Sequence, residues 1–267
     1  MILLDTWDLL IAAALMLILA ALAIYMHLGI AHQVFVAGVR CAAQLLLVGL
    51  VLKTLFEHVN LLWVVGLSFL MLLLASREIH ARQRHRLAGW WSFGVGGISM
   101  FISSFAVAVL ALTVIVGADP WYHPQYAIPL LGMLLGNTMN GVAIGLDRLT
   151  SGAHERRRVI EARLILGHTW REAISDVLRD AIRSGTIPIV NAMAAAGIVS
   201  LPGMMTGQIL AGSPPVEAVK YQIMILFLVS AGTGFGTIAA VWIAARRLFD
   251  ERQRLRLDHL KDQEKST

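Results

Sequence analysis

The sequence predicts an all-α membrane protein with about seven transmembrane helices, and two observations support this prediction. Hydrophobic residues make up 57% of the 267 residues and charged residues only 15%, with a mean hydropathy of +0.71, which is far more apolar than soluble domains are. The charged residues also gather in a few segments, so that the apolar stretches between them reach the roughly 20 residues that a bilayer requires. We expect residues 1–267 to form a single transmembrane domain.

The expected spans lie at about 8–29, 34–56, 61–76, 93–116, 126–146, 185–210 and 222–245. The first span has neither a basic n-region nor a small-residue cleavage site, so we interpret it as a retained helix and not as a signal peptide. The sixth span contains Pro202. Because proline lacks the backbone N–H, this helix should kink or unwind near Ser200 and Leu201, and such breaks occur in membranes only where protein or a cavity satisfies the freed carbonyl.

The basic residues predict the orientation of the helices. Most of the Lys and Arg residues fall within 77–86, 148–184 and 246–267. The positive-inside rule therefore places the C-terminus in the cytoplasm and, with an odd number of spans, the N-terminus outside. We expect a multi-pass protein of the bacterial inner (cell) membrane, with a basic cytoplasmic tail from residue 246. The net charge of +5 is then explained by topology and anionic lipid, and predicts no nucleic-acid partner.

The longest polar loop, at 148–184, is expected to form an amphipathic helix-turn-helix. Leu166, Trp170 and Val177 fall on one apolar face at helical spacing. Gly167 is a typical residue to end the first helix, and Thr169-Trp-Arg-Glu172 is a capping box that begins the second. Such a segment either lies on the lipid headgroups or docks a partner subunit. In the second case Glu161 and Arg163 are candidate charged contacts, and Trp170 is a candidate aromatic anchor.

No enzyme motif occurs in the sequence. There is no G-x-x-x-x-G-K-[ST] phosphate-binding loop, no H-E-x-x-H zinc motif and no G-x-S-x-G elbow. We therefore predict no catalytic residue, no directly bound cofactor and no metal site that the sequence can identify. If ATP drives this protein, a separate subunit must hydrolyse it.

Several polar residues lie within the expected spans. Asn137, Thr138 and Asn140 belong to "LLGNTMNGVAIGLDR" and either form interhelical hydrogen bonds or line a polar path. Arg40 and Gln44 lie one turn apart in the second span, where Arg40 either snorkels to the cytoplasmic surface or contributes to gating or substrate contact. Close helix packing, within a bundle or a homodimer, is predicted by the glycine pairs at small-x-x-x-small spacing, namely 132/136, 141/145, 203/207 and 232/236.

The sixth span is predicted to line the substrate path. It combines the Pro202 break with the thioethers of Met204 and Met205 and the polar groups of Thr206 and Gln208. Methionine sulfur can bind a soft metal ion, but methionine is also a common gap-filler between membrane helices. We consider the combination of these groups, and none of them alone, to indicate a mobile segment that contacts substrate.

Three stretches carry a family resemblance. "LLGNTMNGVAIGLDRL", "EARLILGHTWREA" and "NAMAAAGIVSLPGMMTGQILAGSPPVEAVKYQI" resemble the FetB-type permeases of ABC transporters, a family associated with iron export, and their plant aluminium-tolerance relatives. Glu161-Ala162-Arg163 followed by Gly167 resembles the start of the "EAA" loop that docks bacterial ABC permeases on their ATPases. The resemblance implies a small cytoplasmic ATPase of the FetA type as partner, two permeases with two ATPases as the working unit, and iron as cargo. Because plant relatives are linked to nucleotide-sugar transport as well, a small metabolite stays an alternative cargo.

Three classes of function are compatible with the sequence. The first is an ABC permease in which residues 161–170 transmit ATP-driven motion and residues 137–140 and 202–208 line the path. The second is an ion-gradient transporter, which needs ionisable residues inside the spans, where Arg40 and Asp147 are almost the only candidates. The third is an intramembrane enzyme, which the absence of a catalytic constellation disfavours.

Overall fold

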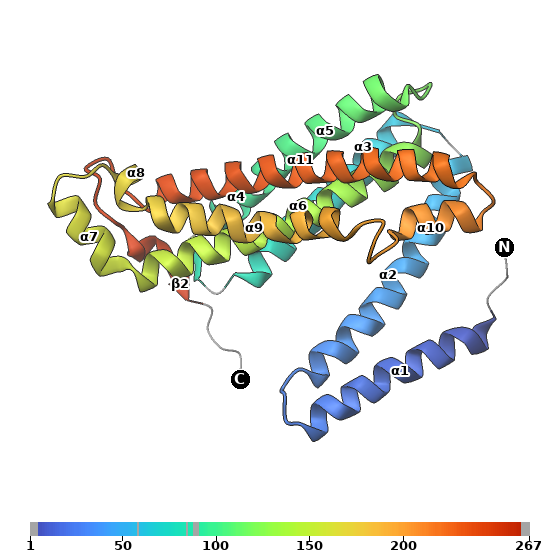
Figure 1. Ribbon diagram of the computed structural model, residues 1–267, viewed down its shortest axis with the longest axis horizontal. Coiled ribbons are helices and arrows are strands. Elements are labelled where there is room, and N and C mark those ends of the chain that lie inside the picture. Colours follow the sequence, from blue (N-terminus) through green and yellow to red (C-terminus); the bar gives the residue numbers. More distant parts are fainter. Residues whose placement is uncertain (1–4, 58, 84, 88–90, 263–267) are drawn as a thin grey trace. The chain divides into compact units, whose positions relative to one another are not determined.

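The structure is a computed structural model that describes residues 5–57, 59–83, 85–87 and 91–262. Its described residues are helical apart from turns, loops and one short two-stranded ribbon (Figure 1). Contacts divide the chain into two compact units, Met1–Asn60 and Leu61–Thr267. The expected all-α membrane fold is confirmed.

The first unit is a helical hairpin of α1 (Thr6–Tyr25) and α2 (Ala31–Glu57), which correspond to the first two expected spans. The chain reverses between them with His27 at φ 53° and Gly29 at φ 70°, left-handed conformations that commonly end helices. Arg40 and Gln44 both lie on α2 with exposed side chains. An exposed apolar hairpin of this kind is stable only in a lipid or protein environment.

The second unit contains the remaining elements. They are α3 (Leu61–Arg82), β1 (His85–Leu87), α4 (Trp91–Met100), the π-helix η1 (Phe101–Phe105), α5 (Ala106–Leu110), the π-helix η2 (Ala111–Val116), α6 (Pro124–Glu155), α7 (Arg157–Ile165), α8 (Trp170–Ala173), α9 (Ser175–Ala195), α10 (Gly203–Leu210), α11 (Pro215–Arg247), the 3₁₀ turn η3 (Leu257–His259) and β2 (Leu260–Asp262). Antiparallel pairing of β1 with β2 joins the end of α3 to the C-terminal tail.

The core of this unit is formed by α6, α9 and α11, which all pack against one another. Glycine permits this packing. A Cβ atom added to Gly185 of α9 would lie 2.5 Å from the backbone oxygen of Gly141 in α6, and one added to Gly141 would lie 2.7 Å from Thr237 Oγ1 in α11. Close backbone approach of this kind is the usual way in which membrane helices associate tightly.

The expected glycine pairs differ in their packing. Gly141/Gly145 and Gly232/Gly236 lie in tight helix contacts, where an added Cβ would meet a neighbouring side chain at 2.5–3.1 Å. By contrast, nothing lies within 4 Å of a Cβ at Gly203, Gly207 or Gly136. The small-residue spacing therefore predicts close packing correctly only where the glycine faces the core.

Six helices of the described chain are long and apolar enough to cross a membrane, and the expected sixth span at 185–210 is not among them. α9 ends at Ala195, and α10 begins at Gly203. The interruption is wider than the kink expected near Ser200 and Leu201, and Pro202 is the N-cap of α10 and does not lie inside a continuous helix. Both α9 and α10 pack on α11, so the two helices follow α11 one after the other, separated by the non-helical residues 196–202.

The helices of the second unit bring the basic segments to one end. α6 and α11 run parallel, because Gly141 and Gly145 of α6 face Thr233 and Val241 of α11 in the same order along the chain. α9 runs antiparallel to both, and Val177 near its start packs on Gly152 near the end of α6. We call the end of the unit where α6 and α11 finish and α9 begins the basic end. Its predicted location in the cytoplasm stays a prediction.

Replacing Gly185 with alanine should force α9 away from α6, because the new methyl group would meet backbone and not a flexible side chain. Overpacking of this kind costs about 1–3 kcal/mol, which for a chain of this size lowers Tm by roughly 2–12 °C. Gly136→Ala is the matched control, since its Cβ meets nothing within 4 Å and alanine favours helix. Thermal unfolding in detergent would contradict this packing if both variants behaved alike.

Candidate functional site

The candidate site is the helix-turn-helix of α7, α8 and the start of α9 at the basic end. α7 ends in a Schellman turn: the His168 N–H donates to the Arg163 carbonyl at 3.1 Å, and the Gly167 N–H donates to the Leu164 carbonyl at 3.0 Å. Gly167 has φ +91°, a conformation that β-branched residues rarely adopt. The expected role of Gly167 as the residue that ends this helix is confirmed.

The expected capping box is also confirmed. Thr169 is the N-cap of α8, and its hydroxyl oxygen accepts a hydrogen bond from the Glu172 N–H at 3.4 Å. In return, the Glu172 carboxylate accepts from the Thr169 N–H at 2.8 Å. This hydrogen bond, with that of the Thr169 hydroxyl, lowers the pKa of Glu172 below its ordinary value. The two caps meet across Gly167 and His168, so the turn has little freedom to change its shape.

Ion pairs join α7 to the helices that follow it. Arg163 Nη2 lies 2.7 Å from Asp176 Oδ2 near the start of α9, and this hydrogen bond lowers the pKa of Asp176. Glu161 pairs with Arg157 within α7 at 2.8 Å. Because a lowered carboxyl pKa keeps the group ionised, the Arg163–Asp176 contact persists at neutral pH and is lost only as the pH falls through that pKa. Glu161 and Arg163 thus have intramolecular partners, while Ala162 between them is exposed.

Trp170, the candidate aromatic anchor, points inward in the structure. It is only 9% exposed, because its ring packs on Phe249 at 5.7 Å and on Trp242 at 6.3 Å between centroids. Arg171 and Arg246 lie over the same ring at 5.5 and 5.6 Å. Trp170 therefore fixes the turn to the end of α11.

The C-terminal tail is part of this site, although no sequence motif predicted a role for it. Beyond α11 the chain turns back at Asp250, whose carboxylate accepts hydrogen bonds from the Arg254 backbone N–H and guanidinium, each at 2.8 Å. The Gln253 side chain accepts from the Trp170 backbone N–H at 2.9 Å. Trp170 and Gln253 are 83 residues apart. A contact between such distant residues leaves no local pattern in the sequence, so only the structure could identify it.

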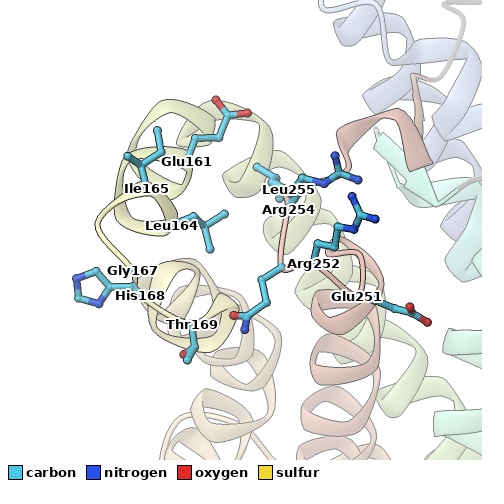
Figure 2. Close-up of a pocket in the computed structure, with 11 residues that line it drawn as sticks. Glu161, Leu164, Ile165, Gly167, His168, Thr169, Glu251, Arg252, Arg254 and Leu255 are labelled. Carbon is cyan, nitrogen blue, oxygen red and sulfur yellow. The ribbon is translucent and has the colours of Figure 1, made fainter.

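A groove of about 770 Å³ lies between α7 and this tail. Figure 2 shows Glu161, Leu164 and Ile165 on the α7 side and Glu251, Arg252, Arg254 and Leu255 opposite, with the turn at Gly167–Thr169 closing one end. Gln253 also lines the groove. Exposed charges of both signs, those of Glu251 and Arg252, stand at its rim. The groove is a surface feature with room for a segment of another protein.

The tip of α7 presents two apolar side chains to its surroundings. Ile165 is 85% exposed and Leu166 is 79% exposed, whereas Trp170 and Val177, which the sequence pattern placed on the same apolar face as Leu166, are buried. The Schellman turn rotates Leu166 away from the bundle. The signal that could have identified this tip is the apolar pair directly before Gly167 in an otherwise charged segment.

The polar residues expected in the fifth span are divided between two environments. Thr138 is fully buried, and its hydroxyl accepts a hydrogen bond from Ser104 of η1 at 3.3 Å. Asn140 is exposed and accepts from Arg82 Nη1 at 2.7 Å, while Asn137 donates to the carbonyl of Met133 one turn earlier. Two of these three residues therefore make the expected interhelical hydrogen bonds, and Asn137 does not.

The residues expected from the sixth span gather on α10. Met205 is buried, Met204 is 37% exposed, and the hydroxyl of Thr206 donates to the carbonyl of Pro202 at 3.1 Å. The side-chain oxygen of Gln208 is buried without a hydrogen-bond partner. These residues lie together on one short helix beside α11.

Buried hydroxyls on α11 are pathway candidates that the sequence analysis missed. The Oγ1 atoms of Thr233 and Thr237 are buried without a hydrogen-bond partner, one turn apart and against Gly141. Opposite, the π-helix η1 buries Ser103 and Ser104, and π-helical turns often occur at functional sites. The glycine spacing on α6 and α11 can be found in the sequence. Which hydroxyl groups lie against those glycines depends on the rotation of each helix about its axis, which the sequence does not show.

Within the described ranges, no group of three or more His, Cys, Asp and Glu side chains is placed to hold a metal ion.

Comparison with known proteins places the chain in a family. The pattern of the "Uncharacterised protein family (UPF0014)" matches residues 6–249. The chain is 40% identical to "UPF0014 membrane protein slr1647" of Synechocystis over 88% of its own length and 90% of that protein. It is 32% identical to the "Probable iron export permease protein FetB" of Escherichia coli, over 94% and 95%. It is 27% identical to "Protein ALUMINUM SENSITIVE 3" of Arabidopsis thaliana, over 91% and 88%. No solved structure matches the chain significantly.

Replacing Thr169 with alanine should loosen the turn, because α8 loses its N-cap. The loss of an N-cap hydroxyl should accelerate amide hydrogen exchange in the Trp170–Ile174 segment about fivefold. Thr169→Ser, which keeps the hydroxyl, should exchange like the native protein. Unchanged exchange in the alanine variant would show that the tail and Arg163 alone fix the turn.

Proposed function

The chain belongs to the UPF0014 family of membrane proteins, and on that premise we propose that it is the membrane-spanning permease subunit of an ABC transporter whose ATP is hydrolysed by a separate subunit. The observation that carries the proposal is the exposed apolar tip of Ile165 and Leu166, held on a doubly capped turn beside a groove. A rigid apolar projection is what a partner subunit needs if it is to push on the permease.

The length of α6 supports a location of this tip beyond the bilayer. Its 32 residues rise about 48 Å, whereas the hydrocarbon core of a bilayer is about 30 Å thick. From Asp147, the first charged residue after its apolar stretch, to Glu155 the helix rises about 12 Å. α7 follows that extension, which favours docking to a protein in water over contact with lipid headgroups.

The path from the tip to the membrane supports a coupling role. Arg163 ties α7 to α9, and α9 packs along α6 and α11 before it ends at Ala195. In the proposed transporter, a push on the tip moves α9 as a lever, and the interruption at 196–202 lets α10 respond separately. A homodimer of permeases with two ATPases of the FetA type is the proposed working unit.

Aspartate in place of Ile165 should weaken binding of the ATPase subunit, because a charge would replace an apolar contact. Burial of such a side chain is worth about 1.5–3 kcal/mol, so we expect at least a tenfold (about 1.4 kcal/mol) rise in Kd for the ATPase and the permease in nanodiscs. Val159→Asp is the matched control: Val159 is also an exposed apolar residue of α7 but does not line the groove. Native affinity in Ile165→Asp, or equal loss in both variants, would refute docking at the tip.

Iron is the proposed cargo, and export the proposed direction, because the Escherichia coli relative carries the name "Probable iron export permease protein FetB". The hydroxyls and thioethers that line α10 and α11 suit a transported ion, which must bind weakly enough to leave. Met204, partly exposed on α10, is the candidate thioether contact.

Ferrous iron should stimulate the ATPase activity of the assembled complex in nanodiscs, and Met204→Leu should reduce the stimulation severalfold. Leucine preserves the volume but removes the sulfur. The parallel Met16→Leu change on α1 serves as control. Stimulation by a nucleotide sugar and not by iron would assign a metabolite as cargo, and activity supported by an ion gradient without the ATPase would refute the ABC proposal itself.

A further inference from the structure

A second groove of about 830 Å³ lies between α3 and the start of the α4–η1 helix, within the second unit. Its walls are almost entirely apolar, and its lining residues include Phe69, Leu73, Phe93, Gly94, Ile98 and Phe101. The lining contains one charged side chain, that of Arg77. Neither the coupling site nor the candidate pathway uses these residues.

The groove is built by the packing of the two helices at one edge. A Cβ at Gly97 would lie 2.9 Å from Ser76 Oγ, and one at Gly96 would lie 3.3 Å from Ile79, so α4 and α3 touch there. Nothing lies within 4 Å of a Cβ at Gly94, so the helices are apart on the other side. The His80 ring stacks on Phe93 at 4.5 Å and helps to hold this aromatic wall in place.

The groove follows the axes of two membrane helices and reaches about the depth of one leaflet. Both walls belong to candidate membrane spans, Leu61–Arg82 and Phe93–Val116. From Arg77 to Phe69 on one helix, and from Phe93 to Phe101 on the other, the rise is about 12 Å, close to the thickness of one leaflet of the roughly 30 Å core. The groove therefore has an apolar floor at membrane depth and a basic mouth.

The charge of Arg77 has no partner in the described part of the chain. Arg82, one turn and a half further on, bonds Asn140 and Glu78, whereas Arg77 is exposed and no described residue forms a hydrogen bond or ion pair with it. Arg77 lies about 7–8 Å inward of the end of α3. Arg77 thus lies where the apolar stretch of α3 ends, at a depth from which an arginine side chain reaches the interface and an anionic headgroup can meet it.

We infer that this groove binds one anionic phospholipid, with an acyl chain along Phe69, Phe93 and Phe101 and the phosphate against the Arg77 guanidinium. Basic pockets between membrane helices are known sites for anionic headgroups. The aliphatic acyl chain of a phospholipid suits the apolar walls of the groove. Its single phosphate carries the negative charge that would balance the Arg77 guanidinium. The lipid would hold α3 and the π-helical segment at a fixed separation, next to the buried Ser103 and Ser104.

Native mass spectrometry of the full-length protein tests this site, with phosphatidylglycerol as the anionic probe and phosphatidylethanolamine as the zwitterionic one. The native protein should bind phosphatidylglycerol more tightly. Arg77→Gln should weaken phosphatidylglycerol binding about fivefold, the worth of one basic residue at a lipid surface, and leave phosphatidylethanolamine binding unchanged. Gly94→Leu should weaken both, because leucine would fill the groove.

Arg148→Gln is the matched control, since Arg148 is an exposed arginine at the basic end of α6. Equal weakening by Arg148→Gln would mean general surface charge and overturn the site, as would unchanged selectivity in Arg77→Gln. A photo-reactive residue at Ile98, which is 56% exposed, identifies the occupant in membranes. A lipid adduct supports the inference, while a cross-link to a second copy or to another protein overturns it. Neither result depends on the ATPase.

Discussion

The close approach of α6, α9 and α11 at Gly141, Gly145 and Gly185 is the constraint on which the second unit depends. The Cβ position of Gly185 lies only 2.5 Å from the backbone oxygen of Gly141. The two helices can therefore pack in this register only with glycine at these positions, because sliding one helix along the other would bring a larger residue into the contact. The register fixed there sends the ends of α6 and α11 and the start of α9 to the same level. The helix-turn-helix and the C-terminal tail can meet only because of this register.

The turn itself is stiff for local reasons. A Schellman motif ends α7, a capping box begins α8, and the Arg163–Asp176 pair joins them to α9. Trp170, enclosed by Phe249, Trp242 and two arginines, attaches the whole to α11. In the proposed transporter this stiffness matters, since a soft turn would absorb the motion of the ATPase. Between α9 and α10 the helical path is interrupted, with Gly197 at φ +84°.

The second unit thus has two grooves of opposite character. The groove beside α7 carries charges of both signs together with an apolar tip, as suits a protein in water. The groove between α3 and α4 carries aromatic and aliphatic walls with one arginine, as suits a lipid. Both rest on the same helix register, so a change in the packing of α6 and α9 would alter the first directly and the second through α3, which packs on α6.

The membrane class, six of the seven expected spans and the caps of the turn could be predicted from the sequence, because hydrophobic runs and the Gly167 and Thr169–Glu172 signals act over a few neighbouring residues. The sequence also predicted that residues near Pro202 would not be regular helix. The tertiary structure was needed to show that Trp170 points inward, that Gln253 and its neighbours in the tail form one wall of the groove, and that Leu166 is exposed. These outcomes depend on helix rotation and on contacts between distant segments, and neither can be predicted from a local sequence pattern.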